Sequence, residues 1–390
     1  MANDILETSE LSRRRLLGLL AASAASGVVS TRRGHAAPQA NDARGNKPTI
    51  PKGAIIRTIL KDLRPEELTG TILFHEHIGS SPDVDVVVEE VEYAGTKGVS
   101  CIVDGGHPDM RRKLENLRAI ATRTKVNIVA SGGYYTQRTY PPEIATKTED
   151  EIATDLAQEA RRDRLGAFGE IGQIPNASDF TRDERKVFRA VGKAHVLANL
   201  PVFTHNAYGT GPNVPREAGL RQLDVFESVG VDPGRVAIGH VCCLDDSSAD
   251  IMKQIAKRGA FVGFDRMEDV HPHRPGAENV VVDVPDAQRV RMILAFLDAG
   301  YVDHLLLSAD CTGQPIKLDE EVNQMVADGW LASGDGKKIK AILEDSMGYM
   351  RTLSGFVPKL RVAGVNEATL RTILQDNPRR FLAFVPKQSA

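Results

Sequence analysis

The sequence predicts an α/β fold, a single (β/α)8 barrel of the TIM type. From Gly53 onward, short apolar and β-branched segments alternate with longer segments whose apolar residues recur three and four positions apart. This strand-then-helix unit repeats over about 250 residues, a length typical of such a barrel. The competing prediction is a doubly wound open sheet. That fold favours a glycine-rich phosphate turn after its first strand, where His75-Glu76-His77 stands instead.

The strands and helices of the barrel follow one another in a regular order. The expected strands are residues 71–74, 101–103, 127–130, 167–171, 201–204, 236–239, 261–264 and 305–308. The expected helices are residues 84–97, 110–124, 149–164, 181–199, 219–229, 247–258 and 286–299. Gly230, Gly259 and Gly300 directly follow three of these helices, where glycine commonly ends a helix. A polar, aperiodic stretch at 311–335 predicts a long loop, and helix returns over 337–381.

Residues 1–36 have the layout of a twin-arginine export signal. Arg13-Arg14-Arg15 precedes a weakly apolar run at 18–29, and small residues follow at Gly34-His35-Ala36. The run is too short for a membrane-spanning helix, so no stable membrane insertion is expected. We therefore expect export by the twin-arginine route to the periplasm or the exterior. A chance basic and apolar start is the alternative. Residues 37–52 are rich in Pro, Asn and Gly and predict a linker, which leaves 53–390 for the barrel.

Composition narrows the classes of partner. Hydrophobic residues make up 42% and charged residues 26% of the chain, as in a soluble globular protein with a sizeable core. A net charge of −3 predicts no nucleic-acid partner. Four cysteines are too few for a disulfide framework at this length, so we expect them to be free and mostly buried.

Metal-ligand residue types stand at the ends of five predicted strands. In a barrel of this kind, the carboxyl ends of the strands meet over one mouth. Imidazole and carboxylate groups are common ligands of divalent metals, and an unpaired buried carboxylate is costly. The sequence therefore predicts a metal site at the carboxyl ends of the strands. Its six candidate ligands are His75, His77, Glu170, His205, His240 and Asp310.

These motifs resemble the amidohydrolase superfamily and, within it, the phosphotriesterase-like family of phosphotriesterases and lactonases. The resemblance covers residues 55–385. It depends on the segments 74–78, 204–205, 230–240, 263–266, 307–310 and 377–381. It implies a small-molecule hydrolase and, because relatives are commonly dimers, a homodimer.

The resemblance also implies roles for the six candidates. His75, His77 and Asp310 would hold the more buried of two divalent ions, and His205 and His240 the more exposed one. Glu170 stands where many members carry a carboxylated lysine that bridges the ions, and resembles the branch in which a glutamate bridges directly. The N and O donors suit zinc foremost, with manganese, iron or cobalt as alternatives.

The expected chemistry is attack by a hydroxide that the two ions share. Asp310 would be the catalytic residue that orients this hydroxide and takes its proton. Cys243 stands where relatives often carry an aspartate that passes the proton outward, so the relay here is weakened or rerouted.

Two further residues are candidate substrate contacts. Tyr135 follows the third strand, where relatives place an aromatic ring against the substrate, although a packed loop aromatic is the alternative. Arg266 follows the seventh strand, and Gly263-Phe264-Asp265-Arg266 looks more like the lactonase branch, although an ion pair at the rim is equally compatible. The expected substrate is a lactone or another carboxylic ester. The alternatives are a phosphotriester hydrolase and a metal-retaining, ligand-binding barrel without turnover.

Overall fold

The computed structural model describes residues 47–81, 83–173, 179–206, 215–267, 284–311 and 348–387. Eight parallel strands form one sheet in chain order, β3 to β10, which confirms the predicted barrel strands. They are β3 (Thr71–Glu76), β4 (Val99–Asp104), β5 (Asn127–Gly132), β6 (Ala167–Gly172), β7 (Val202–His205), β8 (Val236–Ile238), β9 (Phe261–Phe264) and β10 (Leu305–Leu307). The predicted export signal, residues 37–46 of the predicted linker, and the predicted loop beyond Cys311 lie outside the described residues.

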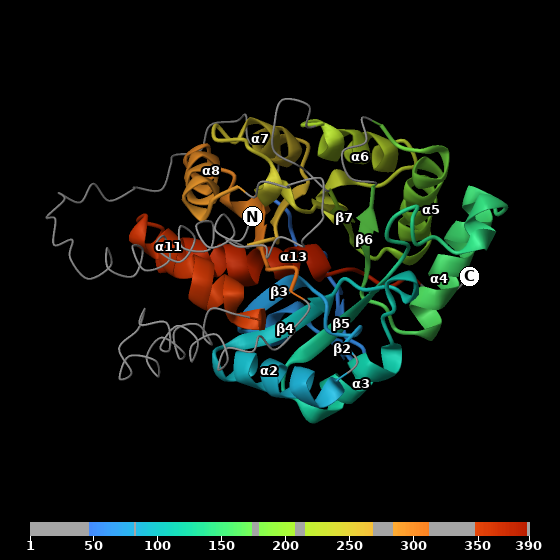
Figure 1. Cartoon of the computed structure of the whole chain (residues 1–390), viewed down its shortest axis with the longest axis horizontal. Helices are drawn as coiled ribbons and strands as arrows, with labels where there is room; N and C mark the ends of the chain where they lie inside the picture. Colours follow the sequence, from blue (N-terminus) through green and yellow to red (C-terminus); the bar gives the residue numbers. More distant parts are fainter. Residues whose placement is uncertain are drawn as a thin grey trace, which may run out of the picture. The chain divides into compact units, whose positions relative to one another are not determined.

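Helices alternate with the strands and surround them (Figure 1). They are α2 (Val84–Thr96), α3 (Leu114–Arg123), α4 (Glu149–Arg162), α5 (Arg182–Ala198), α6 (Ala218–Glu227), α7 (Asp250–Lys257) and α8 (Asp286–Asp298). Strands β3 and β10, the two ends of the sheet order, contact one another, so the sheet closes on itself. Figure 1 shows the C-terminal helices, among them α11 (Val357–Val362), between α8 and α2, where the eighth helix of the ring belongs.

The helix ends agree with the predicted ones at most positions. Gly230, Gly259 and Gly300 have φ angles of 87°, 98° and 87°, a left-handed conformation that glycine adopts without strain and that ends a helix. Helix α7 begins at Asp250 and not at residue 247, and helix α3 begins at Leu114 and not at residue 110. Arg111 there has a φ of 65°, which is incompatible with a helix and turns the chain before α3 begins.

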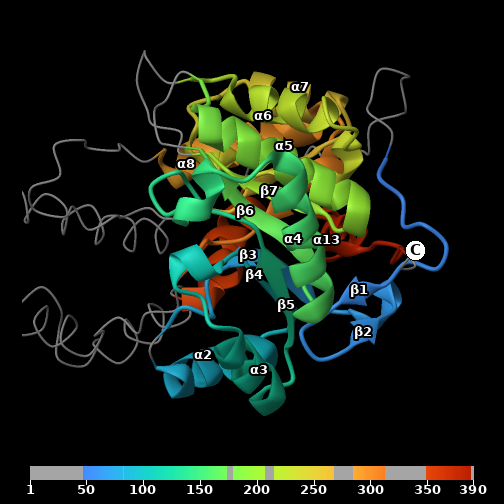
Figure 2. The same cartoon turned by 90° about the vertical axis from the view of Figure 1, so that its right-hand side faces the viewer.

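The barrel interior is filled by apolar side chains below the mouth. Phe74, Phe203 and Phe261 are fully buried there, and Phe381 of α13 (Asn377–Leu382) packs against the rings of Phe74 and Phe261. A short hairpin, β1 (Ile56–Arg57) and β2 (Asp62–Leu63), was not predicted. It lies at the opposite end from the mouth, where Ile128 at the start of β5 and Arg164 just before β6 form hydrogen bonds with it (Figure 2). The filled interior and closed lower end leave the carboxyl ends of the strands as the place for a site.

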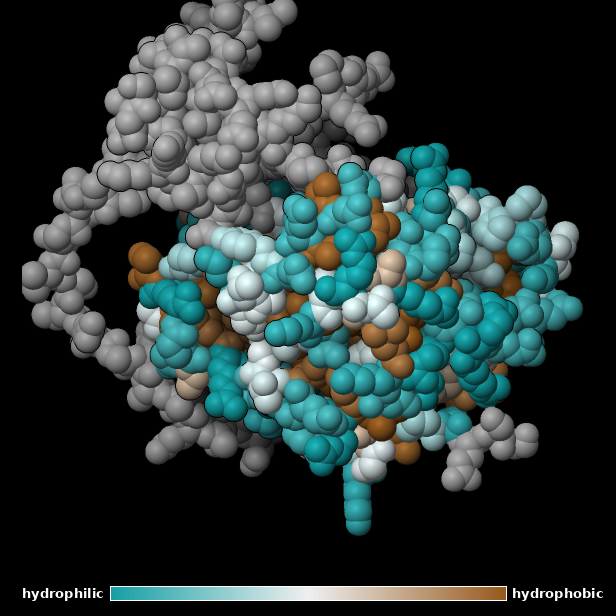
Figure 3. Space-filling view, turned by 90° about the horizontal axis from the view of Figure 1, so that it is seen from below, coloured by the Kyte–Doolittle hydropathy of each residue, from teal (hydrophilic) through white to brown (hydrophobic). Residues whose placement is uncertain are grey.

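The outer surface is mixed in polarity. On the face shown in Figure 3, small groups of hydrophobic residues are scattered among hydrophilic ones. Among the described residues, no helix has both the length and the apolar character that a membrane crossing requires. All four cysteines are free and buried, as predicted.

Candidate metal centre

Two β-bulges lie at the strand ends that supply the central candidates. On β3, Leu73 pairs with Ile102 and Glu76 with Asp104, so three steps along β3 match two steps along β4. A bulge re-aims the side chains beside it. The ring of His75 accordingly points into the barrel and packs against the ring of Phe203, with ring centroids 5.1 Å apart.

Strand β6 has the same irregularity before its candidate ligand. Phe168 pairs with Val202 and Ile171 with Thr204, again three steps against two. Phe168 packs outward with the helices, whereas Glu170, two positions later, points to the mouth and contacts His75. Simple alternation would have placed these two side chains on the same face. The bulge therefore turns Glu170 into the site.

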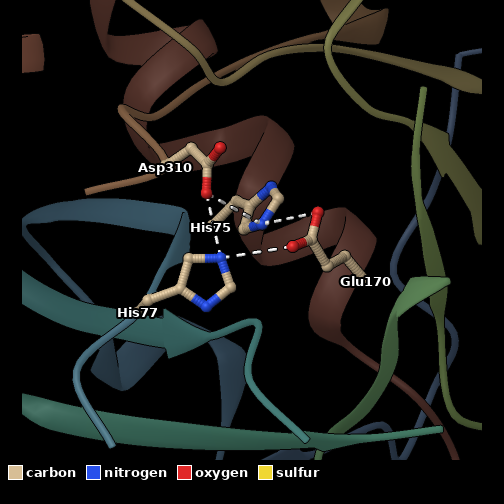
Figure 4. A group of neighbouring side chains, drawn as sticks. All are labelled: His75, His77, Glu170 and Asp310. Carbon is tan, nitrogen blue, oxygen red and sulfur yellow. Dashed lines mark ion pairs between the residues drawn. The ribbon is translucent and has the colours of Figure 1, made fainter. Parts of the chain in front are cut away.

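The first group of candidate ligands surrounds a common point (Figure 4). His77 Nε2 lies 2.9 Å from Asp310 Oδ1 and 3.3 Å from Glu170 Oε1. His75 Nε2 lies 3.4 Å from Glu170 Oε2 and 3.7 Å from Asp310 Oδ1. These four side chains come from the end of β3 and the residue that follows it, from β6 and from the segment after β10, so the barrel gathers them from across the chain.

A second group shares Glu170 with the first. His205 Nδ1 lies 2.9 Å and His240 Nε2 3.4 Å from Glu170 Oε2, and the two imidazole nitrogens lie 2.8 Å from each other. Glu170 Oε1 meanwhile faces His77. One carboxylate therefore contacts both groups. The structure brings all six candidates together at one end of the barrel.

Asp265 belongs to the site, although it is not among the six ligands predicted from the sequence. It is fully buried directly after β9, and its two oxygens lie 2.9 Å from His75 Nδ1 and 3.0 Å from His240 Nδ1. The backbone N–H of His240 donates to the same carboxylate. Asp265 thus orients one imidazole of each group, which is how outer carboxylates fix ligand histidines. The signal in the sequence that could have indicated this residue is an aspartate directly between an apolar strand and an arginine.

The protonation states of His75 and His240 indicate whether the site suits a bound cation. A carboxylate only accepts hydrogen bonds, so Nδ1 of both His75 and His240 must carry the proton that faces Asp265. When these rings are neutral, their Nε2 atoms present lone pairs. His75 Nε2 is buried, has no hydrogen-bond partner, and faces the Glu170 carboxylate. Lone pairs that converge in this way fit a bound cation.

The electrostatics of the group also favour positive charge. Burial acts to lower the pKa of His77, but its hydrogen bonds to Asp310 and Glu170 outweigh burial and raise that pKa to about 10. Burial acts to raise the pKa of Glu170, yet the neighbouring His205 and His75 hold it well below the usual range. The carboxylates therefore stay ionised and stabilise any cation between the rings.

The two candidate substrate contacts border this group. The hydroxyl of Tyr135 lies 3.3 Å from His205 Nε2, and the Tyr135 ring meets the His205 ring edge-on. Arg266 is half-buried, directly after Asp265, and its backbone N–H donates to the Cys242 thiol. Cys243 is buried and donates its backbone N–H to His240, so it supports the turn that carries this candidate ligand.

Comparison with known proteins finds relatives that match most of the chain. A model of the phosphotriesterase family matches residues 74–382. The phosphotriesterase homology protein of Escherichia coli is 28% identical over 331 residues, covering 80% of this chain and 98% of the relative. The aryldialkylphosphatase of Saccharolobus solfataricus is 28% identical over 301 residues, covering 76% and 84%. The N-acetyltaurine hydrolase of Xenopus tropicalis is 24% identical over 321 residues, covering 79% and 80%.

A solved structure is similar over the same region. The crystal structure of the Escherichia coli phosphotriesterase homology protein, complexed with phosphate in its active site, superposes with a TM-score of 0.64 at 25% identity. The similarity covers 80% of this chain and 99% of that one.

Proposed function

The chain belongs to the phosphotriesterase family of hydrolases, and we propose that it hydrolyses a lactone or another carboxylic ester with the help of two divalent metal ions. The observation that supports this most directly is the position of Glu170. Its Oε1 faces His77 of one candidate ligand group and its Oε2 faces His205 of the other. A carboxylate shared in this way is suited to bridging two ions, for which zinc is our first choice and manganese, iron or cobalt are alternatives.

The ions would supply a hydroxide near neutral pH and polarise the carbonyl or phosphoryl oxygen of the substrate. His75, His77 and Asp310 would hold one ion, His205 and His240 the other, and Glu170 both. Asp265 keeps the Nδ1 protons of His75 and His240 turned away from the ions. The protein thereby fixes the donor atoms in advance.

Asp310 is our candidate for the residue that takes the proton from the attacking water. Its side chain is 19% exposed, whereas those of His75, Glu170 and His240 are at most 2% exposed. Asp310 therefore reaches the mouth where a substrate arrives. Its carboxyl pKa is lowered, because contact with His77 and the charges of His75 and His240 outweigh the effect of burial. The carboxylate is thus ionised and able to accept a proton.

Tyr135 and Arg266 would contact the substrate beside the metal centre. The position of Tyr135 against His205 supports this role for its ring, and the order Gly263-Phe264-Asp265-Arg266 supports the lactonase branch. A second candidate function is phosphotriester hydrolysis. It is favoured by the similarity to an aryldialkylphosphatase and to a protein that holds phosphate in its active site.

The test is a substrate panel with a matched pair of variants. Lactones, aryl esters and phosphotriesters are assayed with Zn²⁺, Mn²⁺ and Co²⁺ on the wild type, Asp310→Asn and Asp62→Asn. Asp310→Asn should lose about 10²- to 10⁴-fold in kcat/KM, the range for loss of a positioned general base. Asp62 lies in the hairpin at the far end of the barrel, so its variant should retain activity.

The panel separates the alternatives by outcome. Preferred turnover of phosphotriesters supports the second function. Metal binding without turnover of any substrate indicates a ligand-binding barrel. Full activity of Asp310→Asn contradicts the proposed role of this residue.

We also propose that residues 1–36 direct export by the twin-arginine route, on the layout of Arg13-Arg14-Arg15 and the apolar run that follows. Replacing Arg13, Arg14 and Arg15 by lysine should leave the protein inside the cell. Fractionation of cells that express either form would decide this, and export of the lysine variant would contradict the proposal.

A further inference from the structure

Glu76 is the last residue of β3 and stands between His75 and His77, and its side chain forms hydrogen bonds with residues other than the six candidate ligands. It is fully buried and turned toward the segment that follows β10. Its Oε1 accepts hydrogen bonds from the Ser308 hydroxyl at 2.7 Å and from the backbone N–H of Ala309 at 3.0 Å. Its Oε2 accepts from the backbone N–H of Cys311 at 2.7 Å. Three donors of this segment therefore converge on one carboxylate, on both sides of Asp310.

The same segment is joined to the β3 backbone. The N–H of Asp310 donates to the carbonyl of His75 at 3.1 Å, and the N–H of His77 donates to the carbonyl of Cys311 at 2.8 Å. The Ser308 hydroxyl accepts the N–H of His75 at 3.1 Å. These bonds connect the first and the last strand of the barrel at its mouth. They also fix the relative positions of three candidate ligands of one ion.

Asp310 needs such support because of its backbone conformation. Its φ is 52°, in the left-handed region that residues with a side chain rarely adopt. A residue of this kind keeps its conformation only where the surroundings over-determine it. Glu76 binds the N–H groups immediately before and immediately after Asp310.

We propose that Glu76 is a positioning residue, which holds Asp310 in its left-handed conformation and so within coordinating distance of the ion shared with His75 and His77. The proposal rests on the proposed function, because it assigns Glu76 to one of the two ion positions. It also makes a statement about the segment 308–311 itself, which can be measured whether or not an ion is bound.

The number of acceptor atoms on the side chain makes glutamine an informative substitution. Both carboxylate oxygens accept hydrogen bonds, whereas an amide offers one oxygen and one NH2 group. In either orientation of the amide, the NH2 group faces a backbone N–H, that of Ala309 or that of Cys311, which then loses its acceptor. Glu76→Gln therefore keeps the volume of the side chain and removes one of its two hydrogen bonds from the backbone beside Asp310.

The experiment compares Glu76→Gln with Glu184→Gln. Glu184 is another fully buried glutamate that accepts a backbone N–H, that of Thr181, but it lies at the start of α5, outside the site. Both variants and the wild type are titrated with a chelator while bound metal is counted. Steady-state kinetics give kcat and KM on the best substrate of the panel, and amide hydrogen exchange is followed on the peptide containing residues 305–311, with and without metal.

We expect Glu76→Gln to bind one of its two ions at least 10-fold more weakly, the lower end of the range for outer-shell substitutions. Its kcat should fall at least 10-fold with KM within about twofold, and the amides of residues 309–311 should exchange faster in both states. Glu184→Gln should change none of these. Unchanged exchange at 309–311, unchanged metal affinity, or equal effects in both variants would overturn the proposal. A wild type without metal and without turnover would reject the proposed function, while the exchange experiment would still decide the role of Glu76.

Discussion

His240 Nε2 lies 2.8 Å from His205 Nδ1 at the mouth of the barrel. The Nδ1 atom of His240 must carry a proton because it faces the carboxylate of Asp265. Its Nε2 atom then presents a lone pair toward His205, or carries a second proton. Two imidazole nitrogens this close require either a proton on one of them, which forms a hydrogen bond, or a cation to which both lone pairs bind. A divalent cation held by both, together with Glu170, meets this requirement without a proton.

Removal of metal should therefore affect stability as well as catalysis. Dialysis against a chelator should abolish hydrolysis and lower the melting temperature. A ligand that binds only the folded state stabilises it by about 2.7 kcal/mol when it is present at 100 times its Kd. Addition of Zn²⁺, Mn²⁺ or Co²⁺ should restore both properties, as measured by thermal unfolding and by the ester assay. An unchanged melting temperature, with metal analysis showing that the ions have left, would contradict a structural contribution of the ions.

Asp265→Asn should weaken metal binding without changing any proposed ligand. Asparagine keeps one acceptor oxygen, so it can orient His75 or His240 but not both, and the other ring loses its fixed tautomer. We expect a 10- to 100-fold loss of metal affinity, measured by chelator competition. The matched control is Asp246→Asn, a buried aspartate that accepts the N–H groups of Ile251 and Met252 at the start of α7. The control should lose stability but keep its metal affinity, and equal metal loss in both variants would contradict the role of Asp265.

Tyr135 offers a test that separates its ring from its hydroxyl. Tyr135→Phe removes only the contact with His205 Nε2 at 3.3 Å and leaves the aromatic surface. Because a single neutral hydrogen bond contributes about 1 kcal/mol, kcat/KM should fall by less than 10-fold. Tyr135→Ala removes the surface as well and should raise KM further. Equal KM values for the two variants would show that the ring does not contact the substrate.

The barrel could be predicted from the sequence because each strand and helix is marked by a residue pattern within its own segment. Each strand is a short run of apolar residues and each helix has its own apolar stripe, so β9 begins and ends at the predicted residues. The side chains that follow the strand ends converge because parallel strands share one mouth, which is a property of the fold and needs no knowledge of distances. The order of elements therefore predicts that His75, Glu170, His240 and Asp310 come from strand ends at one mouth, but not that each side chain points into it.

The remaining features depend on pairings between distant residues. The bulges in β3 and β6 arise from the register with β4 and β7. Gly169 inside β6 is a local signal of a bulge, but β3 contains no glycine. The contact of Asp265 with His75 spans 190 positions, and that of Glu76 with Cys311 spans 235. Both acids lie within motif segments of the sequence, 74–78 and 263–266. Their partners became identifiable only when the strands had been placed.

The pH dependence of stability provides a prediction away from the site. His195 of α5 is buried, and its Nδ1–H donates to the Leu200 carbonyl at 2.6 Å. Burial lowers the pKa of His195 to about 4, aided by the charges of Arg235 and Lys387. In the unfolded chain this pKa returns to the ordinary value near 6.5. Below that pH the unfolded chain binds a proton that the folded chain excludes, so stability is lost as the pH falls from about 6.5 to about 4.

The size of this effect and its origin can be measured together. At about 1.4 kcal/mol per pH unit, His195 alone accounts for a loss of up to about 3 kcal/mol across this window. His195→Asn places an amide nitrogen at the position of Nδ1, so it can still donate to Leu200 but cannot titrate. Urea unfolding at pH 7 and pH 4.5 should therefore show a smaller loss of stability in the variant than in the wild type. Because other histidines are present in both proteins, only the difference between the two losses reports on His195. If the two losses are equal, His195 does not resist protonation in the folded state.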